Sequence, residues 1–318
     1  MVDSKTARTP AVAQATDAVL MVRPASFGFN AETCESNRFQ RDDATLGSSA
    51  QALARQEFDG VVDALRDSGV TVAMVEDEAA PRCPDAIFPN NWVSLHADGT
   101  VVLYPMLARS RRAERRYEHL HALARATGRR VHRVLDLTHH ELAGRFLEGT
   151  GSVVFDHRAR VAFAALSPRT HREPLDELCG ELGYRPCVFR AGDASGVPIY
   201  HTNVLLAIGT TFAVVATGSI EPAQREAVLG ELRRGHREIF EIDAHAMASF
   251  AGNVLELRAT DGARLLAMSA AAERALGPDR LDGLRRHVDR IVAAPIPTIE
   301  TLGGGSVRCM LAEVFLPR

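Results

Sequence analysis

Five polar side chains stand at the starts of similar hairpin-like segments, and together they could attack a planar, nitrogen-bearing carbon. They are Asp85, Glu148, His201, Asn253 and Cys309. A thiol near an acid/base histidine becomes an activated nucleophile, because the imidazole can accept its proton. A carboxylate can hold a planar guanidinium group through paired, charge-assisted hydrogen bonds. These residue types therefore favour covalent catalysis on a guanidinium-like group, with Cys309 as the nucleophile.

Each of these residues also has an ordinary structural interpretation. A lone cysteine is usually a small buried apolar residue, and a single histidine is commonly a satisfied core residue. Asp85 could form a turn and Glu148 could lie in a loop, while Asn203 and Asn253 could cap backbone groups. The glycines at 303–305 could form a flexible turn, and no Gly-Lys-Ser/Thr sequence follows them as in a phosphate loop. Independent structural roles do not explain why all of these residues fall at the same phase of a repeat.

The repeat is a strand–turn–strand motif. Its copies begin near residues 91, 152, 203, 253 and 306, and Asp-Gly pairs punctuate the hairpins at 98–99 and 261–262. The last copy lacks a return strand, which the apolar segment Ala18–Arg23 could supply, closing a ring. A supersecondary unit that recurs every roughly 50–60 residues indicates a cyclic or stacked array.

Amphipathic segments between the hairpins predict helices, and several are followed by a short strand. The predicted helices cover residues 49–68, 109–127, 169–182, 222–234 and 279–292, and two of the following strands cover 70–75 and 237–242. We therefore predict an α/β fold of five ββαβ units around a centre. Residues 18–318 are expected to form one domain, since no linker-like stretch divides them, and residues 1–17 are expected to be a disordered tail.

The composition is that of an ordinary globular protein. The net charge of −3 gives no overall basic field for nucleic acid or an anionic membrane. No stretch approaches the roughly 18 apolar residues of a membrane span. The five scattered cysteines favour a reducing compartment. Lys5 is the only lysine among 37 basic residues, which we interpret as the coding bias of a GC-rich bacterium. We expect a cytoplasmic protein with a small-molecule partner, and the sequence is compatible with a homo-oligomer.

The hairpin starts resemble those of the guanidine-modifying, pentein-fold superfamily, which includes arginine deiminases, dimethylarginine hydrolases, succinylarginine dihydrolases and amidinotransferases. The shared motifs are Asp85…Phe88, Glu148-Gly149, His201-x-Asn203, Phe250-x-x-Asn253 and Gly303-Gly304-Gly305-Ser306-x-Arg308-Cys309. A closer similarity to the bacterial citrulline-utilization hydrolase type is carried by Met21-Val22-Arg23-Pro24, Asn90-Asn91-Trp92, Tyr200-His201-Thr202-Asn203-Val204 and Arg308-Cys309-Met310-Leu311-Ala312-Glu313. The resemblance implies a five-bladed, pseudo-symmetric α/β propeller, the pentein fold, with the active site on its central axis.

The resemblance also implies a role for each residue of the site. Cys309 would attack the central carbon and form a covalent Cys-amidino intermediate. His201 would protonate the leaving amine and then deprotonate water, while Glu148 would orient His201. The expected substrate-binding residues are Asp85, Phe88, Asn91, Asn203, Asn253 and Arg23. Neither a metal nor a cofactor is expected.

One position departs from the deiminase pattern. Deiminases often carry His-x-Asp, where this chain has His201-Thr202-Asn203. An amide donates and accepts hydrogen bonds but cannot neutralise a cation, which leaves room for a substituted guanidine or a neutral ureido group such as that of citrulline. The segment Phe27–Gln40 could recognise the other end of the substrate, with Arg23 or Arg38 meeting a carboxylate. Surface ion pairs are an equally compatible role for both arginines.

Three functions are compatible with these residues. The first is a hydrolase of arginine-like guanidino or ureido compounds, and the second is an amidinotransferase that passes the group to an amine. The sequence does not decide between water and an amine, because the choice depends on how the pocket excludes solvent. The third is a non-enzymatic binding protein on the same scaffold, against which the retained cysteine, histidine and carboxylates argue.

Overall fold

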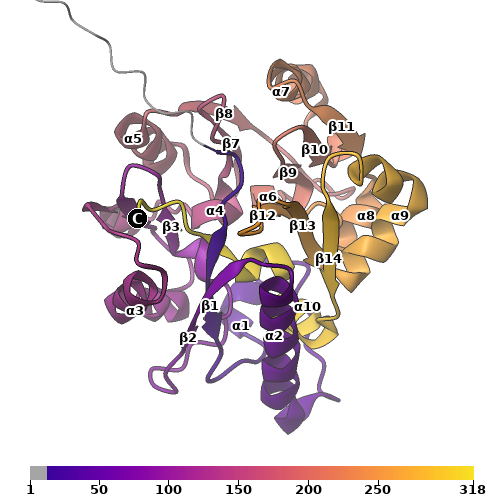
Figure 1. The fold of residues 1–318 in the computed structure, drawn as a ribbon. Coiled ribbons are helices and arrows are strands. Elements are labelled where there is room, and N and C mark those ends of the chain that lie inside the picture. The colour runs from indigo at the N-terminus through magenta and orange to yellow at the C-terminus, as the bar shows by residue number, and fades with distance from the viewer. Residues whose placement is uncertain (1–12) are drawn as a thin grey trace, which may run out of the picture.

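The computed structural model describes residues 13–318 and contains five three-stranded sheets arranged around a centre (Figure 1). In chain order of their first strands, the sheets are β3 (Val93–Leu95), β4 (Thr100–Leu103) and β5 (Arg133–Asp136); β6 (Val154–Asp156), β7 (Val161–Ala165) and β8 (Arg185–Phe189); β9 (Leu206–Ile208), β10 (Phe212–Val215) and β11 (Glu238–Glu241); β12 (Leu255–Arg258), β13 (Arg264–Ser269) and β14 (Arg290–Ala294); and β15 (Ala312–Glu313), β1 (Ala18–Arg23) and β2 (Thr71–Glu76). In every sheet the first two strands are antiparallel and the third is parallel to the second. The predicted α/β fold of five ββαβ units is confirmed.

Helices connect the second and third strands of each unit, as parallel pairing requires. They are α2 (Ala50–Asp67), α3 (Tyr117–Thr127), α5 (Arg172–Leu182), α7 (Pro222–Arg234) and α9 (Ala270–Leu284). The shorter helices are α1 (Ala31–Cys34), α4 (Gly149–Ser152), α6 (Thr202–Leu205), α8 (Ala244–Ala248) and α10 (Pro297–Gly303). Six 3₁₀ turns complete the described elements: η1 (Gly47–Ser49), η2 (Pro89–Asn91), η3 (Arg109–Glu114), η4 (Thr138–Ala143), η5 (Thr217–Ser219) and η6 (Val307–Met310).

The two ends of the described chain close the ring. Strand β15 pairs antiparallel with β1, with Val19 opposite Glu313 and Leu20 opposite Ala312. The prediction that Ala18–Arg23 completes the fifth unit is therefore confirmed. The last hairpin copy, predicted to begin near residue 306, has its first strand later, because Val307–Met310 forms η6 and the strand starts only at Ala312.

The helix predicted at 279–292 is also wrong in its boundaries. Helix α9 starts at Ala270, whereas Arg290–Ala294 forms strand β14 parallel to β13. A kink at Gly277, whose φ is 73°, and Pro278 interrupt α9. These two residues made the first half of the helix look like a loop, since glycine and proline normally punctuate helices.

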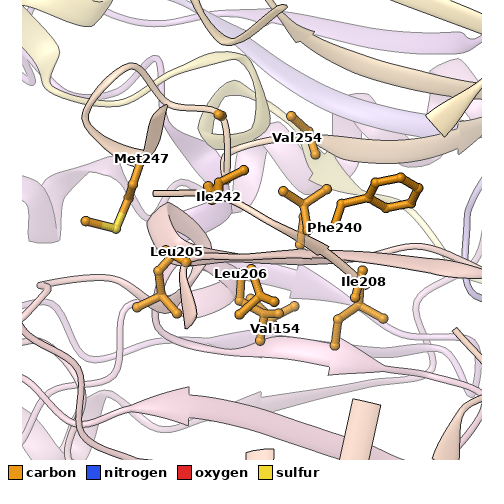
Figure 2. Packing of buried hydrophobic residues seen from close by; sticks show 14 of the residues in the cluster. Val154, Leu205, Leu206, Ile208, Phe240, Ile242, Met247 and Val254 are labelled. Carbon is orange, nitrogen blue, oxygen red and sulfur yellow. The ribbon is translucent and has the colours of Figure 1, made fainter. Parts of the chain in front are cut away.

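Apolar side chains from neighbouring units interdigitate (Figure 2). Leu205, Leu206 and Ile208 of one unit share a buried cluster with Val154 of the preceding unit and Val254 of the following one. Each such side chain contributes roughly 1.5–3 kcal/mol when fully buried. This shared packing holds the starts of successive units in fixed relative positions.

The predicted tail extends to residue 17, and residues 1–12 lie outside the described part of the chain. Gln14, Ala15 and Thr16 are buried. The amide nitrogen of Gln14 donates hydrogen bonds to the carbonyls of Phe155 at 2.9 Å and Ile208 at 3.2 Å. These residues therefore pack as part of the fold rather than as a tail. Within residues 13–318, none of the helices combines the length and the apolar character needed to cross a membrane.

Candidate active site

A short helical turn or loop precedes the first strand of each unit and carries the polar side chains of the site. Turns η2, α4, α6 and η6 stand just before β3, β6, β9 and β15. Glycine permits the close contact between two of these turns. A Cβ atom on Gly149, whose φ is +47°, would lie 2.1 Å from the carbonyl oxygen of Asn90, and one on Gly151 would lie 2.8 Å from the His201 ring.

Cys309 is buried in η6, and its sulfur faces two side-chain amides from other units. The Nδ2 atom of Asn253 donates to Sγ at 3.3 Å, and that of Asn203 donates at 3.6 Å. Amide donors directed at a sulfur are suited to stabilise negative charge on it. Asn253 also donates to the carbonyl of Asn203 at 3.1 Å, which fixes the two amides relative to each other.

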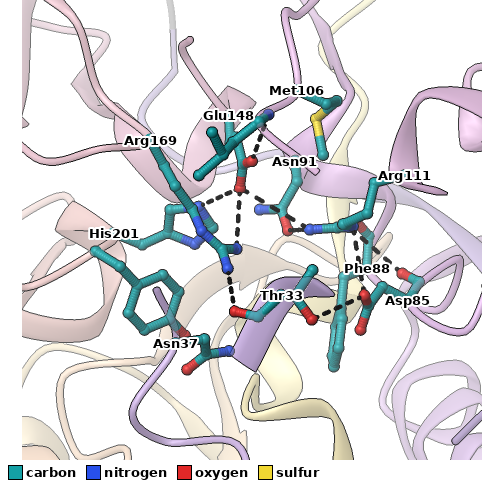
Figure 3. Close-up of polar contacts among 12 residues, drawn as sticks. Thr33, Asn37, Asp85, Phe88, Asn91, Met106, Arg111, Glu148, Arg169 and His201 are labelled. Carbon is teal, nitrogen blue, oxygen red and sulfur yellow. Dashed lines mark hydrogen bonds and ion pairs between the residues drawn. The ribbon is translucent and has the colours of Figure 1, made fainter. Parts of the chain in front are cut away.

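His201 and Glu148 form a buried pair (Figure 3). The Nε2 atom of His201 donates to Oε2 of Glu148 at 2.8 Å, which leaves Nδ1 with the free lone pair. Burial lowers the pKa of His201 to about 4, and the hydrogen bond to Glu148 opposes this only in part. Burial by itself raises the pKa of Glu148, but Arg169, His201 and Arg111 outweigh it and hold this pKa well below its usual range. The resting pair is therefore a neutral imidazole beside a carboxylate.

Two buried arginines complete the charged network (Figure 3). Arg169 approaches Glu148 at 3.2 Å and donates to the carbonyl of Thr33 at 2.8 Å. Arg111 forms a two-pronged pair with Glu114, with both hydrogen bonds at 2.9 Å, and donates to Oδ1 of Asn91 at 2.8 Å. Glu148 and Glu114 are thus each neutralised by an arginine of the same chain.

Asp85 has mainly uncharged partners. Its Oδ2 atom accepts a hydrogen bond from Asn30 at 2.7 Å and one from Thr33 at 3.4 Å. Arg111 is more distant, at 3.9 Å. Asn30 also caps α1 by accepting from the backbone N–H of Glu32 at 3.1 Å. Helix α1 is therefore anchored over the site by the same carboxylate that is expected to bind the substrate.

The cavity that these residues enclose has a volume of about 10 Å³, which is about the space of one water molecule. It is lined by Thr33, Asn37, Asp85, Phe88, Asn91, Arg111, Arg169, Tyr200, His201, Gly303, Gly304, Gly305 and Cys309. Phe88 packs so closely on the glycines that a Cβ on Gly303 would lie 2.8 Å from its ring. A substrate larger than a water molecule therefore requires some of the residues that line the cavity to move apart.

Most of the predicted site residues are brought together. Cys309, His201, Asp85, Phe88 and Asn91 line the cavity. Glu148, Asn203 and Asn253 bond to residues that line it. Arg23 is not at the cavity, because it pairs with Asp59 at 2.6 Å and Glu76 at 3.4 Å. Arg38 pairs with Asp193 at 3.4 Å on the wall of an adjacent pocket of about 580 Å³.

Arg111, Arg169 and Glu114 were not identified from the sequence. Arginine is abundant throughout this chain, and Arg111 lies within the run Arg109-Ser110-Arg111-Arg112. The only hint was that Glu114 follows Arg111 by one helical turn, a spacing that allows an ion pair.

Five ββαβ units around a buried thiol, an imidazole–carboxylate pair and a further carboxylate are the arrangement of the arginine-modifying pentein superfamily. Residues 23–316 match the sequence model of the family described as N,N dimethylarginine dimethylhydrolase, eukaryotic, and the chain belongs to this family. Its members include hydrolases that act on guanidino C–N bonds. A search among curated proteins found no match.

Several solved structures share the fold. The arginine dihydrolase ArgZ from Cyanobacteria, without ligand, has a TM-score of 0.72 and 15% identity over 94% of this chain, which spans 41% of that protein. The N-terminal domain of ArgZ, covalently bound to a reaction intermediate, has a TM-score of 0.71 and 15% identity, covering 94% of this chain and 98% of the domain. A dimethylarginine dimethylaminohydrolase adduct with S-methyl-L-thiocitrulline has a TM-score of 0.64 and 16% identity, covering 93% and 98%. At such identities these similarities establish the fold alone.

Proposed function

We propose that this protein is a cysteine-dependent hydrolase that cleaves a C–N bond at the central carbon of an arginine-like guanidino or ureido compound. The observation that carries the proposal is the convergence of Cys309, the His201–Glu148 pair and Asp85 on one buried cavity. Different units contribute these residues, so we further propose that residues 18–318 act as one catalytic domain.

In the proposed first step, Sγ of Cys309 bonds to the central carbon while its proton passes to Nδ1 of His201. The protonated His201 is stabilised by the carboxylate of Glu148 at 2.8 Å. It then gives the proton to the departing nitrogen as the C–N bond breaks. The amides of Asn203 and Asn253 stabilise the sulfur, and the products of this step are a free amine and an acylated or amidinated cysteine.

In the second step, neutral His201 takes a proton from a water molecule that attacks the same carbon. The S–C bond breaks and the proton returns to the sulfur, which restores the resting thiol and imidazole. Burial that keeps the pKa of His201 at about 4 favours this role, because the imidazole is an available base at neutral pH. Glu148 acts by holding the tautomer with Nδ1 free.

We propose that a neutral ureido group of the citrulline type is preferred over the guanidinium of arginine. Glu148 and Glu114 already have arginine partners, whereas Asp85 has no cation within hydrogen-bonding distance among residues 13–318. Within the same described residues, two buried amide atoms of the site, Nδ2 of Asn91 and Oδ1 of Asn203, have no hydrogen-bond partner. A ureido group offers a carbonyl acceptor and N–H donors, which complement this free donor and free acceptor.

A substrate screen tests both the proposed reaction and the proposed preference for a ureido group. The full chain is incubated with citrulline, arginine, methylated arginines, agmatine and guanidino acids, and ammonia, methylamine, ornithine and ureido products are measured, with Cys309→Ser as the inactive control. We expect citrulline to be converted to ornithine, ammonia and carbon dioxide with the highest kcat/KM. A tenfold preference for arginine would overturn the ureido assignment. Turnover that occurs only with an added amine, and yields its amidino or carbamoyl derivative, would identify a transferase instead.

A further inference from the structure

A second cluster of chemically active side chains lies at the edge of the unit formed by β6, β7 and β8. His139 and His140 are consecutive residues of η4, and Glu177 faces them from α5. The Nε2 atoms of both imidazoles approach the same oxygen, Oε2 of Glu177, at 3.3 Å for His139 and 2.8 Å for His140. One ligand atom from each of the three residues lies within 4.8 Å of the other two.

The contact of His139 with the backbone determines the tautomer of its neutral ring. Its Nδ1 atom lies 3.2 Å from the backbone carbonyl of Asp136. A carbonyl oxygen only accepts, so Nδ1 carries the hydrogen and Nε2 of the neutral ring presents a lone pair. That lone pair faces a carboxylate oxygen, which also has only lone pairs to offer. Either a proton on Nε2 or a metal cation between the two atoms removes this repulsion. A backbone carbonyl bonded to the distal ring nitrogen is the usual support of a metal-binding histidine.

The spacing of the three atoms fits a small divalent cation. Ligands about 2.0–2.1 Å from zinc at tetrahedral angles stand about 3.3–3.4 Å apart. The separation between His139 and Glu177 already has this value, at 3.3 Å. The contact of His140 with Glu177 needs to lengthen by about half an ångström, and Glu177, whose side chain is 37% exposed, has room to move. No arginine pairs with Glu177 among residues 13–318, so its charge is left to the imidazoles.

We propose that His139, His140 and Glu177 form a binding site for a late first-row divalent cation such as Zn²⁺, separate from the catalytic cavity. Two imidazoles and one carboxylate are a ligand set that zinc accepts, with the remaining position open to water. No metal was expected from the sequence, because two adjacent histidines completed by a glutamate from a distant helix have no recognisable ligand spacing along the chain.

The cation would clamp two segments that lead to the active site. Turn η4 runs into the segment that carries Glu148, and α5 follows Arg169 closely in the chain. The backbone N–H of Glu148 donates to the carbonyl of Arg169 at 3.2 Å, so the two segments already meet at the catalytic end. Zn²⁺ would tie them together a second time, at the outer edge of the unit.

Calorimetric titration with ZnCl₂ tests the site on the full, tag-free chain in a Cys309→Ser background, which removes the active-site thiol as a competing ligand. We expect one Zn²⁺ to bind per chain, and the affinity to fall at least about tenfold in His139→Ala and in Glu177→Gln. The side chain of His139 is 55% exposed, so its replacement leaves the core intact. Zn²⁺ should also raise the Tm of the parent and fail to do so in His139→Ala.

The matched control is His287→Ala. His287, whose side chain is 13% exposed, pairs with Glu238 at 3.0 Å, and its Nδ1 atom bonds to Thr211 at 2.8 Å. No second imidazole within residues 13–318 joins this pair. Zinc affinity should be unchanged in this variant. A parent that binds no Zn²⁺, or site variants that bind it as tightly as the control, would overturn the proposal.

Discussion

The first strands of the five units have two ends, and these ends are built differently. Where the strands start, buried charges and a thiol surround a small cavity. Within the described part of the chain, three buried amide atoms at this end, Asn90 Oδ1, Asn91 Nδ2 and Asn203 Oδ1, have no hydrogen-bond partner. Where two of the strands finish, His96 and His157 are buried in neutral hydrogen bonds. His96 contacts the hydroxyl of Ser94 and His157 that of Tyr184, both at 2.7 Å, and Gln14 closes the end beside them.

The two ends of the same strands therefore differ in role: the starting end carries the candidate active site, and the finishing end closes the fold. Unmatched donors and acceptors are unfavourable in a buried site unless a ligand satisfies them. Such atoms are retained around the cavity at the starting end, whereas the histidines at the finishing end bond to hydroxyl groups. The finishing end also holds one buried ion pair, Asp156 with Arg237, in which Nη2 of Arg237 has no further partner among residues 13–318. Changes at the starting end should therefore affect turnover more than stability, and changes at the finishing end should do the reverse.

The sharpest test is Cys309→Ser, for which the largest effect is expected. A serine hydroxyl is a far weaker nucleophile at neutral pH than a cysteine thiol, so kcat/KM should fall by about 10⁴-fold. The side chain is nearly isosteric, and Tm should change by no more than about 2 °C. Steady-state kinetics and thermal unfolding measure the two quantities. Unchanged turnover would exclude Cys309 as the nucleophile. A large drop in Tm would show that the starting end of the strands also determines stability.

Acid should destabilise the protein through its buried histidines. Burial lowers the pKa of His96 to about 4 and that of His157 to about 3, from an ordinary value of 6.5. The unfolded chain then binds more protons than the native state between about pH 6.5 and 4. Stability is complete above this window and declines as the pH falls through it, by about 2–3 kcal/mol for each histidine at pH 4.5. Urea unfolding at a series of pH values measures the slope.

The matched variant for this effect is His157→Gln, which keeps a polar side chain but cannot gain a proton. Its stability should depend less steeply on pH between 6.5 and 4 than that of the parent. An identical slope in the two proteins would show that His157 is not held neutral by burial. Activity of the variant at pH 7 should stay close to that of the parent, because His157 lies away from the cavity.

The repeat in the sequence sufficed to predict the five units, the closure of the ring and the residue types that meet at its centre. Each unit begins with similar turn and strand residues, so the phase of Cys309, His201, Glu148 and Asp85 was visible without coordinates. Arg169 was not predictable, because its position depends on the register between the turn before α5 and Glu148. The burial of Gln14 was equally hidden, since its partners are backbone carbonyls in two distant strands.

Glu148→Gln should lower kcat by about 10²-fold, which is less than the loss of the nucleophile. The amide keeps the shape of the carboxylate but no longer stabilises a protonated His201 across the 2.8 Å contact. The variant also leaves Arg169 without its buried counter-charge, so a moderate drop in Tm is expected. Comparison with Glu226→Gln, a change on the protein surface, controls for the loss of one negative charge. A kcat equal to that of the parent would show that Glu148 does not assist His201.

The smallest effect should come from Gln14→Ala at the finishing end. The substitution removes hydrogen bonds to the carbonyls of Phe155 and Ile208 and leaves these acceptors, together with the backbone N–H of His157, without their partner. The free energy of unfolding should fall by about 1–3 kcal/mol. kcat and KM should be unchanged, since Gln14 joins strands at the end remote from Cys309. A selective loss of kcat with unchanged stability would mean that the finishing end takes part in catalysis, and the division between the two ends would then be wrong.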